Sequence, residues 1–291
     1  MVPLELARLT ALMERTSGRL DVRIGLIDGP VAIQHPDLAG GRLREIQGTN
    51  GATCTLANSS ACMHGTFIAG ILSAKRNSPA PAICPGCTLL IRPVFAEKTI
   101  GSEQTPSATP QELAAAIVEC INAGARVINL SLALAQPSSK GEQALEEALD
   151  QALKRGVIVV AAAGNQGTLG GSAITRHRWV IPVVGYNLQG RPTNESNLGS
   201  SIGRRGVGAP GDSVTSLSAE GQPVTFGGTS VAVPFVTGAI ALLWSEFPAA
   251  SAAQIQLAVT QAAVPRRASV VPPLLDAWAA YQSLLVTNAW R

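Results

Sequence analysis

Charged and aromatic side chains are scarce in this sequence of 291 residues: Asp, Glu, Lys and Arg together make up 14%, and Phe, Trp and Tyr 4%. Hydrophobic residues make up 46%, so the chain has ample material for a large buried core, and this balance argues against intrinsic disorder. No run of Lys or Arg stands out, and the net charge is only +3. We therefore expect no nucleic-acid partner.

The sequence also lacks an uncharged apolar run of about 20 residues, the length that a membrane span requires, so we expect no membrane partner. In residues 1–19 the apolar positions have helical spacing, but charged residues interrupt them. This N-terminal helical extension therefore lacks the continuous apolar segment that an export signal needs. We also expect it to be too short for a folded pro-domain. We expect a cytoplasmic protein, with the mature form of a secreted protein as the alternative. The sequence predicts no particular oligomeric state.

Cysteines are few, and their number is odd: Cys54, Cys62, Cys84, Cys87 and Cys120. At least one thiol is therefore unpaired within the chain. The first four could form two disulfides, hold a zinc ion or be small buried residues, and we favour disulfides over zinc. The pair in Cys84-Pro-Gly-Cys87 resembles a redox motif, but it precedes a predicted strand instead of following one, so redox chemistry ranks last.

Short, continuously apolar runs alternate with helical patterns, which is typical of an α/β fold with a mostly parallel sheet, buried on both faces by helices in three layers. We expect one domain over residues 1–291. The predicted strands are Arg23–Ile27, Thr88–Val94, Arg126–Leu130, Val157–Ala162 and Val180–Val184. The predicted helices are His64–Ala74, Pro110–Ala123, Glu142–Arg155, Ser230–Glu246 and Ala252–Ala263; the stretches 40–61, 97–109 and 185–228 are the less regular ones.

Four polar residues fall where an α/β sheet gathers its catalytic groups, beyond the carboxyl ends of the strands. Asp28 and Asn165 each follow a predicted strand, and His64 and Ser230 each open a predicted helix. Taken singly, each has a structural interpretation as a cap or turn residue. Together they supply a hydroxyl nucleophile, a base, a carboxylate that orients the base, and a donor for an oxyanion.

The segments around these residues resemble the motifs of subtilisin-like serine proteases, in the same order along the chain. The similar segments are Asp28-Gly29, His64-Gly65-Thr66, Ala163-Gly164-Asn165 and Gly228-Thr229-Ser230, with Val127–Leu132 similar to the substrate-lining strand. The resemblance covers roughly residues 20–285. It implies that His64 deprotonates Ser230, that Asp28 orients His64, and that Asn165 binds the oxyanion. The substrate-binding residues that it implies are Ser131, Leu132, Ala133, Ala162 and Gly164.

The resemblance implies a peptide or protein substrate and no required cofactor. Calcium loops of the family often fall near residues 74–82, but this segment has no acidic residue, so we expect no structural calcium there. Within the family, the segment Pro93-Val94-Phe95 and the cysteine-containing loop are most similar to proteases that mature cyanobactin-type peptides, which implies removal of a leader from a precursor. The alternatives are a catalytically silent peptide-binding module of the same fold, and a metal-dependent enzyme at the cysteines.

One departure from the family pattern predicts restricted specificity. Ser131-Leu132-Ala133-Leu134 stands where the family usually has Ser-Leu-Gly-Gly, and the two larger side chains should narrow the adjacent pocket. We expect small or slender side chains before the cleaved bond. A cleavage profile measured with a peptide library checks this, and a preference for large aromatic residues there would refute it.

Overall fold

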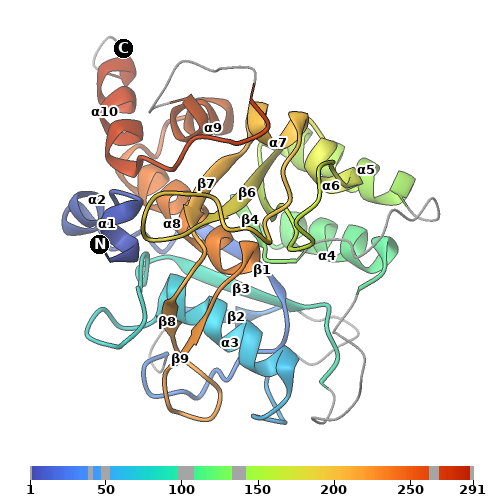
Figure 1. Cartoon of the computed structure of the whole chain (residues 1–291). Helices are drawn as coiled ribbons and strands as arrows, with labels where there is room; N and C mark the ends of the chain where they lie inside the picture. The colour runs from blue at the N-terminus through green and yellow to red at the C-terminus, as the bar shows by residue number, and fades with distance from the viewer. Residues whose placement is uncertain are drawn as a thin grey trace.

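The computed structural model describes residues 2–38, 42–46, 53–97, 108–132, 142–261 and 269–288. In this part of the chain, seven parallel strands form one sheet in the order β2-β3-β1-β4-β5-β6-β7 (Figure 1). The strands are β1 (Arg23–Asp28), β2 (Leu43–Glu45), β3 (Thr88–Pro93), β4 (Val127–Leu130), β5 (Ile158–Ala162), β6 (Val180–Tyr186) and β7 (Val207–Pro210). A separate antiparallel hairpin consists of β8 (Val214–Ser216) and β9 (Val224–Phe226).

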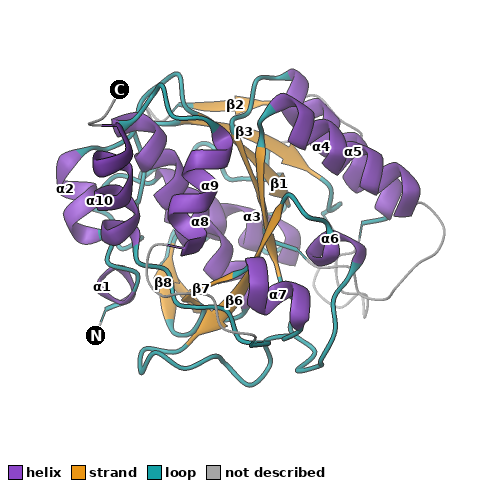
Figure 2. Cartoon of the chain, turned by 90° about the horizontal axis from the view of Figure 1, so that it is seen from above, coloured by secondary structure: helices purple, strands orange, loops and turns teal. Residues whose placement is uncertain are grey.

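Helices cover both faces of the sheet, as Figure 2 shows. The face packed on α3 and α8 carries the larger core cluster, and α4 and α5 bury the other face. The helices are α1 (Pro3–Leu6), α2 (Thr10–Arg15), α3 (Ser60–Ser73), α4 (Pro110–Asn122), α5 (Glu142–Arg155), α6 (Ala173–Arg176), α7 (Ser200–Arg205), α8 (Thr229–Glu246), α9 (Ala252–Gln261) and α10 (Ala277–Asn288). The predicted three-layer α/β fold is therefore confirmed.

Helix α8 lies at the centre of this arrangement. Its apolar residues are not confined to one side, as is typical of a helix surrounded by protein. Within the described residues it is the one helix long and apolar enough to cross a membrane, and 89% of that window is buried inside the protein. It packs on β4, β5, β6 and β7, which is the position of a core helix.

The strands and helices that were predicted lie close to observed ones, and one difference in bounds is informative. Helix α3 begins at Ser60, not at His64, so His64 is its fifth residue. The Ser59 side chain caps the helix, because its Oγ accepts a hydrogen bond from the Cys62 N–H at 3.1 Å. The prediction missed this first turn, Ser60–Met63, and began the helix at the histidine.

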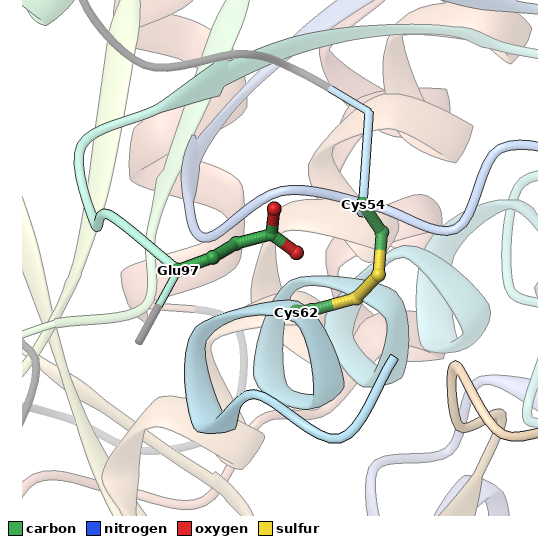
Figure 3. Close-up of side chains that lie close together, drawn as sticks. All are labelled: Cys54, Cys62 and Glu97. Atoms are coloured by element: carbon green, nitrogen blue, oxygen red, sulfur yellow. A yellow bond between two sulfur atoms is a disulfide. The ribbon is translucent and has the colours of Figure 1, made fainter. Parts of the chain in front are cut away.

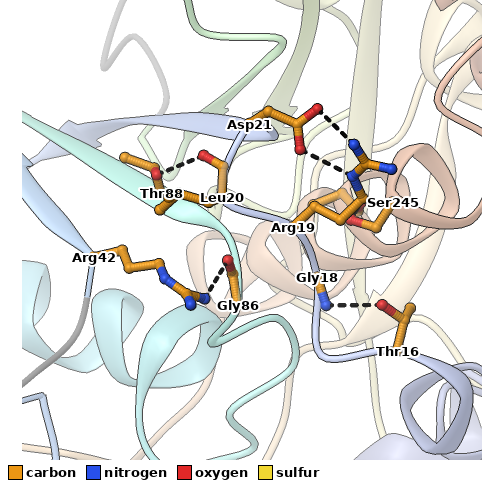
Figure 4. Close-up of polar contacts among 10 residues, drawn as sticks. Thr16, Gly18, Arg19, Leu20, Asp21, Arg42, Gly86, Thr88 and Ser245 are labelled. Carbon is orange, nitrogen blue, oxygen red and sulfur yellow. Dashed lines mark hydrogen bonds and ion pairs between the residues drawn. The ribbon is translucent and has the colours of Figure 1, made fainter.

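The N-terminal segment is anchored to the sheet and to α8 rather than extended into solvent. Leu9 and Leu12 are fully buried in the main core. The linker that follows is held by polar contacts drawn in Figure 4, among them the Thr88 hydroxyl donating to the Leu20 carbonyl at 2.8 Å. A Cβ on Gly18 would come within 2.5 Å of the Cys87 sulfur, so the linker backbone lies directly against that thiol.

The five cysteines separate into one disulfide and three buried thiols. Cys54 and Cys62 are joined, with their Cα atoms 5.5 Å apart, whereas Cys84, Cys87 and Cys120 are free. Of the first four cysteines, only Cys84 and Cys87 are therefore free thiols. Two of the four sulfurs are bonded to each other, and among the described residues neither Cys84 nor Cys87 belongs to a cluster of potential metal ligands.

The disulfide fixes the loop that leads into α3, the helix that carries His64. A second attachment comes from Glu97, beyond the end of β3: its carboxylate accepts hydrogen bonds from the backbone N–H groups of Thr55 and Leu56, both at 2.8–3.1 Å. Figure 3 shows the Glu97 carboxylate pointing toward the bridge at the start of the helix. Covalent and polar contacts therefore hold the same loop from two sides.

We expect the double variant Cys54→Ser/Cys62→Ser to lose about 2–3 kcal/mol of unfolding free energy, because the bridge no longer restricts the unfolded chain. For a chain of this length that corresponds to a fall in Tm of roughly 3–5 °C, which differential scanning calorimetry measures. Dithiothreitol should lower the Tm of the wild-type protein similarly and leave the double variant unchanged. A wild-type Tm that is insensitive to the reductant contradicts the prediction.

Candidate active site

The strand register brings three chain segments to one edge of the sheet. Leu130 of β4 is level with Ile27 of β1 and with Ala161 of β5. The residues that come next along the three strands are Asp28, Ser131 and Ala162. Because neighbouring strands lie about 4.8 Å apart, these residues lie side by side at the carboxyl edge.

Asp28 and His64 form the central polar contact at this edge. The His64 Nδ1 atom lies 2.7 Å from the Asp28 Oδ1 atom, which also accepts the Gly29 N–H at 2.7 Å. Asp28 is fully buried, while 28% of the His64 side chain is exposed. The carboxylate therefore orients an imidazole whose other nitrogen, Nε2, is left for a different partner.

Two glycines allow this contact, since they let the exit of β1 touch α3 backbone to backbone. A Cβ on Gly29 would lie 2.0 Å from the Ala61 carbonyl oxygen, and one on Gly65 would lie 2.4 Å from the carbonyl oxygens of Gly29 and Pro30. Any larger residue at either position would push the helix away from the strand. The glycines after Asp28 and after His64 therefore set the separation of the two side chains.

The environment of His64 favours its charged form. Burial on its own lowers the pKa of the imidazole, but the negative charge of Asp28 and the hydrogen bond to it act in the opposite direction. The net result is a pKa above the ordinary value of about 6.5 for histidine. A base whose pKa lies above its ordinary value accepts a proton more readily.

Ser230 is the second residue of α8, and a proline in that helix determines how its backbone is held. Pro234 has no N–H, so the carbonyl of Ser230, four residues earlier, has no helical partner. The Ser131 hydroxyl donates to this carbonyl at 2.8 Å. The end of β4 is thereby joined directly to the residue predicted to be the nucleophile.

A buried relay stands behind Ser131. The Asn129 Nδ2 donates to the Ser131 hydroxyl oxygen at 2.8 Å, and the Thr237 hydroxyl donates to Asn129 Oδ1 at 3.0 Å. All three residues are buried. The relay begins and ends on α8, so it fixes the register of this helix against β4.

Asn165 follows β5 and is held by the residue that precedes Ser230. Its Oδ1 atom accepts hydrogen bonds from the Thr229 N–H at 2.8 Å and from the Thr229 hydroxyl at 2.9 Å. The same hydroxyl oxygen accepts the Gly164 N–H at 3.2 Å. With its oxygen engaged in this way, the amide leaves its Nδ2 donor available for another partner.

The structure places the remaining predicted site residues as follows. Ser131, Leu132, Ala162 and Gly164 are buried at the same edge of the sheet, and Ala133 lies outside the described residues. The described residues include no hydrogen bond between the Ser230 hydroxyl and His64, a contact that is often long until substrate binds. Helices α3 and α8, which carry the two residues, pack against each other.

The sequence analysis missed the supporting residues. Thr229, Asn129 and Thr237 were not expected to act at the site, because each works through hydrogen bonds to segments that are distant in sequence. The only signal for Thr229 was its place beside Ser230. Pro234 could have been noticed, because a proline inside a predicted helix frees a carbonyl four residues earlier.

Comparison with known proteins shows the family to which the sequence is similar. The model of the subtilase family, Peptidase S8, matches residues 20–283. Subtilisin DY from Bacillus licheniformis is 31% identical over 241 residues, which cover 81% of this chain and 81% of that protein. A thermostable alkaline protease from Halalkalibacterium halodurans is 30% identical over 242 residues, covering 83% of this chain; the match spans 62% of that longer protein.

Solved structures give the same result for the fold. A variant of the protease domain of PatA superposes with a TM-score of 0.84 at 28% identity, covering 93% of this chain and 97% of the other. The prenylagaramide maturation protease PagA superposes with a TM-score of 0.82 at 26% identity, covering 95% and 98%.

We expect an NMR titration of the imidazoles to give His64 a pKa above about 6.5 in the wild-type protein. In Asp28→Asn that pKa should fall, because burial, which lowers it, would no longer be opposed by the carboxylate charge. The variant His177→Gln serves to assign the signals. An unchanged His64 titration in Asp28→Asn would show that the carboxylate does not set the pKa.

Proposed function

The chain belongs to the subtilase family of serine endopeptidases, and on that premise we propose that it cleaves peptide bonds with Asp28, His64 and Ser230 as catalytic triad and Asn165 as oxyanion donor. The observation that carries this proposal is the 2.7 Å contact between His64 and the buried Asp28. This contact lies at the carboxyl edge of the sheet. At the same edge, the Ser131 hydroxyl donates a hydrogen bond to the Ser230 carbonyl and so holds the backbone of Ser230 there.

The proposed reaction begins with proton transfer from the Ser230 hydroxyl to His64 Nε2 while the oxygen attacks the carbonyl carbon of the peptide. Asp28 accepts the Nδ1–H of His64, which keeps Nε2 unprotonated before the attack and stabilises the imidazolium after it. His64 then gives the proton to the departing amine, and the acyl group remains on Ser230. Water, activated by the same imidazole, releases the acid and restores the hydroxyl.

The negative oxygen formed during the attack needs donors already in place. The Thr229 contacts occupy Asn165 Oδ1, so the proposed donor is Asn165 Nδ2, together with the backbone N–H of Ser230. Loss of one such donor typically lowers turnover by about 10²–10³-fold. None of these steps uses a metal ion or an organic cofactor, and we propose that none is required.

For the substrate, we propose a precursor peptide from which a leader is removed. The support is the likeness to PatA and to PagA, which is described as a maturation protease, at 26–28% identity over more than 90% of this chain.

The disulfide bears on the compartment in which the protein works. Disulfides persist mainly in oxidising compartments, so Cys54–Cys62 supports the secreted alternative over the cytoplasmic one.

The competing proposal is a peptide-binding module that kept the fold without activity. The pKa of His64 argues against it. Burial lowers this pKa, but the charge of Asp28 and the hydrogen bond to it outweigh burial, so the net shift is upward. A binding module gains nothing from an imidazole poised to take a proton.

We expect the wild-type protein to cleave peptides and Ser230→Ala to lose at least about 10³-fold in kcat, as followed by mass spectrometry of a peptide library. A fluorophosphonate probe should label the wild-type protein at Ser230. The variant Ser213→Ala, which removes an exposed hydroxyl bonded to Asp212, is the control and should retain activity. Absence of both cleavage and labelling in folded wild-type protein would favour the binding module.

A further inference from the structure

Two loops run side by side next to the proposed oxyanion donor. One follows β5 and contains Asn165; the other lies between β6 and α7. Backbone hydrogen bonds connect them: the Asn197 N–H donates to the Gly164 carbonyl at 2.9 Å, and the Leu198 N–H donates to the Thr168 carbonyl at 3.0 Å. The second loop therefore forms a support for the first.

The side chain of Asn197 adds five contacts to this support. Its Oδ1 atom accepts hydrogen bonds from the Gln166 N–H, the Thr168 N–H and the Thr168 hydroxyl, each at 3.1 Å. Its Nδ2 donates to the Ala163 carbonyl at 3.2 Å and to Gln166 Oε1 at 2.6 Å. One amide thus satisfies backbone groups on both sides of Asn165.

Asn165 depends on such outside contacts because its own loop has no regular structure. Gly164 and Gly167 have φ values of +105° and +62°, in the region that favours glycine, and Asn165 itself is exposed. A Cβ on Gly164 would lie 2.4 Å from Asn197 Nδ2, so the side chain fits closely against the backbone turn. Thr229 orients the Asn165 amide, but the path of the backbone is set by Asn197.

We propose that Asn197 is a positioning residue for the oxyanion hole: it fixes the backbone before and after Asn165, so that Nδ2 of Asn165 is in place when the negative oxygen forms. This inference rests on the proposed function. A donor displaced by about 1 Å stabilises the transition state less while substrate binding changes little. The effect of Asn197 therefore falls on kcat.

The test compares Asn197→Ala with Asn187→Ala, a matched control. Asn187 also accepts two backbone N–H groups in a turn, those of Gln189 and Arg191 at 3.1 and 3.0 Å, with no contact to Asn165. We expect Asn197→Ala to lower kcat about 10–100-fold and to change KM by less than about threefold. Asn187→Ala should alter neither. Equal kcat values for the two variants would overturn the proposal.

A double-mutant cycle separates positioning from general destabilisation. If Asn197 acts through Asn165, kcat of Asn165→Ala/Asn197→Ala equals that of Asn165→Ala alone; independent effects would multiply, and that result would overturn the proposal. The variant Asn197→Asp keeps the three accepted contacts and loses the two donated ones, so its kcat should lie between wild type and Asn197→Ala. It also provides the test if Asn197→Ala does not fold.

Different results refute the proposed function and the positioning role of Asn197. A wild-type protein that does not cleave peptides refutes the proposed function. A wild-type protein that cleaves peptides, with Asn197→Asp and Asn197→Ala both as active as it, refutes only the positioning role.

Discussion

The site depends on one buried carboxylate with an imidazole as its partner. Asp28 is fully buried, its Oδ1 atom is shared between His64 and a backbone N–H, and its Oδ2 atom has no hydrogen-bond partner among the described residues. An ionised carboxylate in a protein interior is costly by several kcal/mol unless a partner compensates it. The position of His64 is therefore a requirement of the fold as well as of the chemistry. The close backbone contact at Gly29 and Gly65 exists to meet that requirement.

The proposed nucleophile and the proposed oxyanion donor are held in another way, by hydrogen bonds between segments that are distant in sequence. Ser131 bridges β4 to α8, Thr229 bridges α8 to the loop after β5, and Asn197 supports that loop from the segment after β6. Each link is a hydrogen bond between segments distant in sequence, so breaking one leaves a polar group without its partner. Together these hydrogen bonds favour a single arrangement of the residues at the carboxyl edge of the sheet.

The sequence was a good guide where a pattern extends over many residues. The continuous apolar runs of β1, β3, β4, β5 and β6 and the helices α4 and α5 were predicted close to their observed bounds. It was a poor guide to β2, β7, β8 and β9, because these short strands lie in the stretches 40–61 and 185–228, which carry no regular apolar pattern. The relay through Asn129 and the role of Asn197 were beyond it, because a hydrogen bond between distant segments leaves no mark in local composition.

The proline within α8 has a consequence for protein engineering. Proline in a helix interior is about 3 kcal/mol less favourable than alanine, so its replacement by alanine suggests itself as a stabilising change that restores a missing hydrogen bond. At Pro234 the restored N–H would compete with Ser131 for the Ser230 carbonyl. A substitution chosen for helix propensity alone would thus strengthen α8 internally but weaken its attachment to β4.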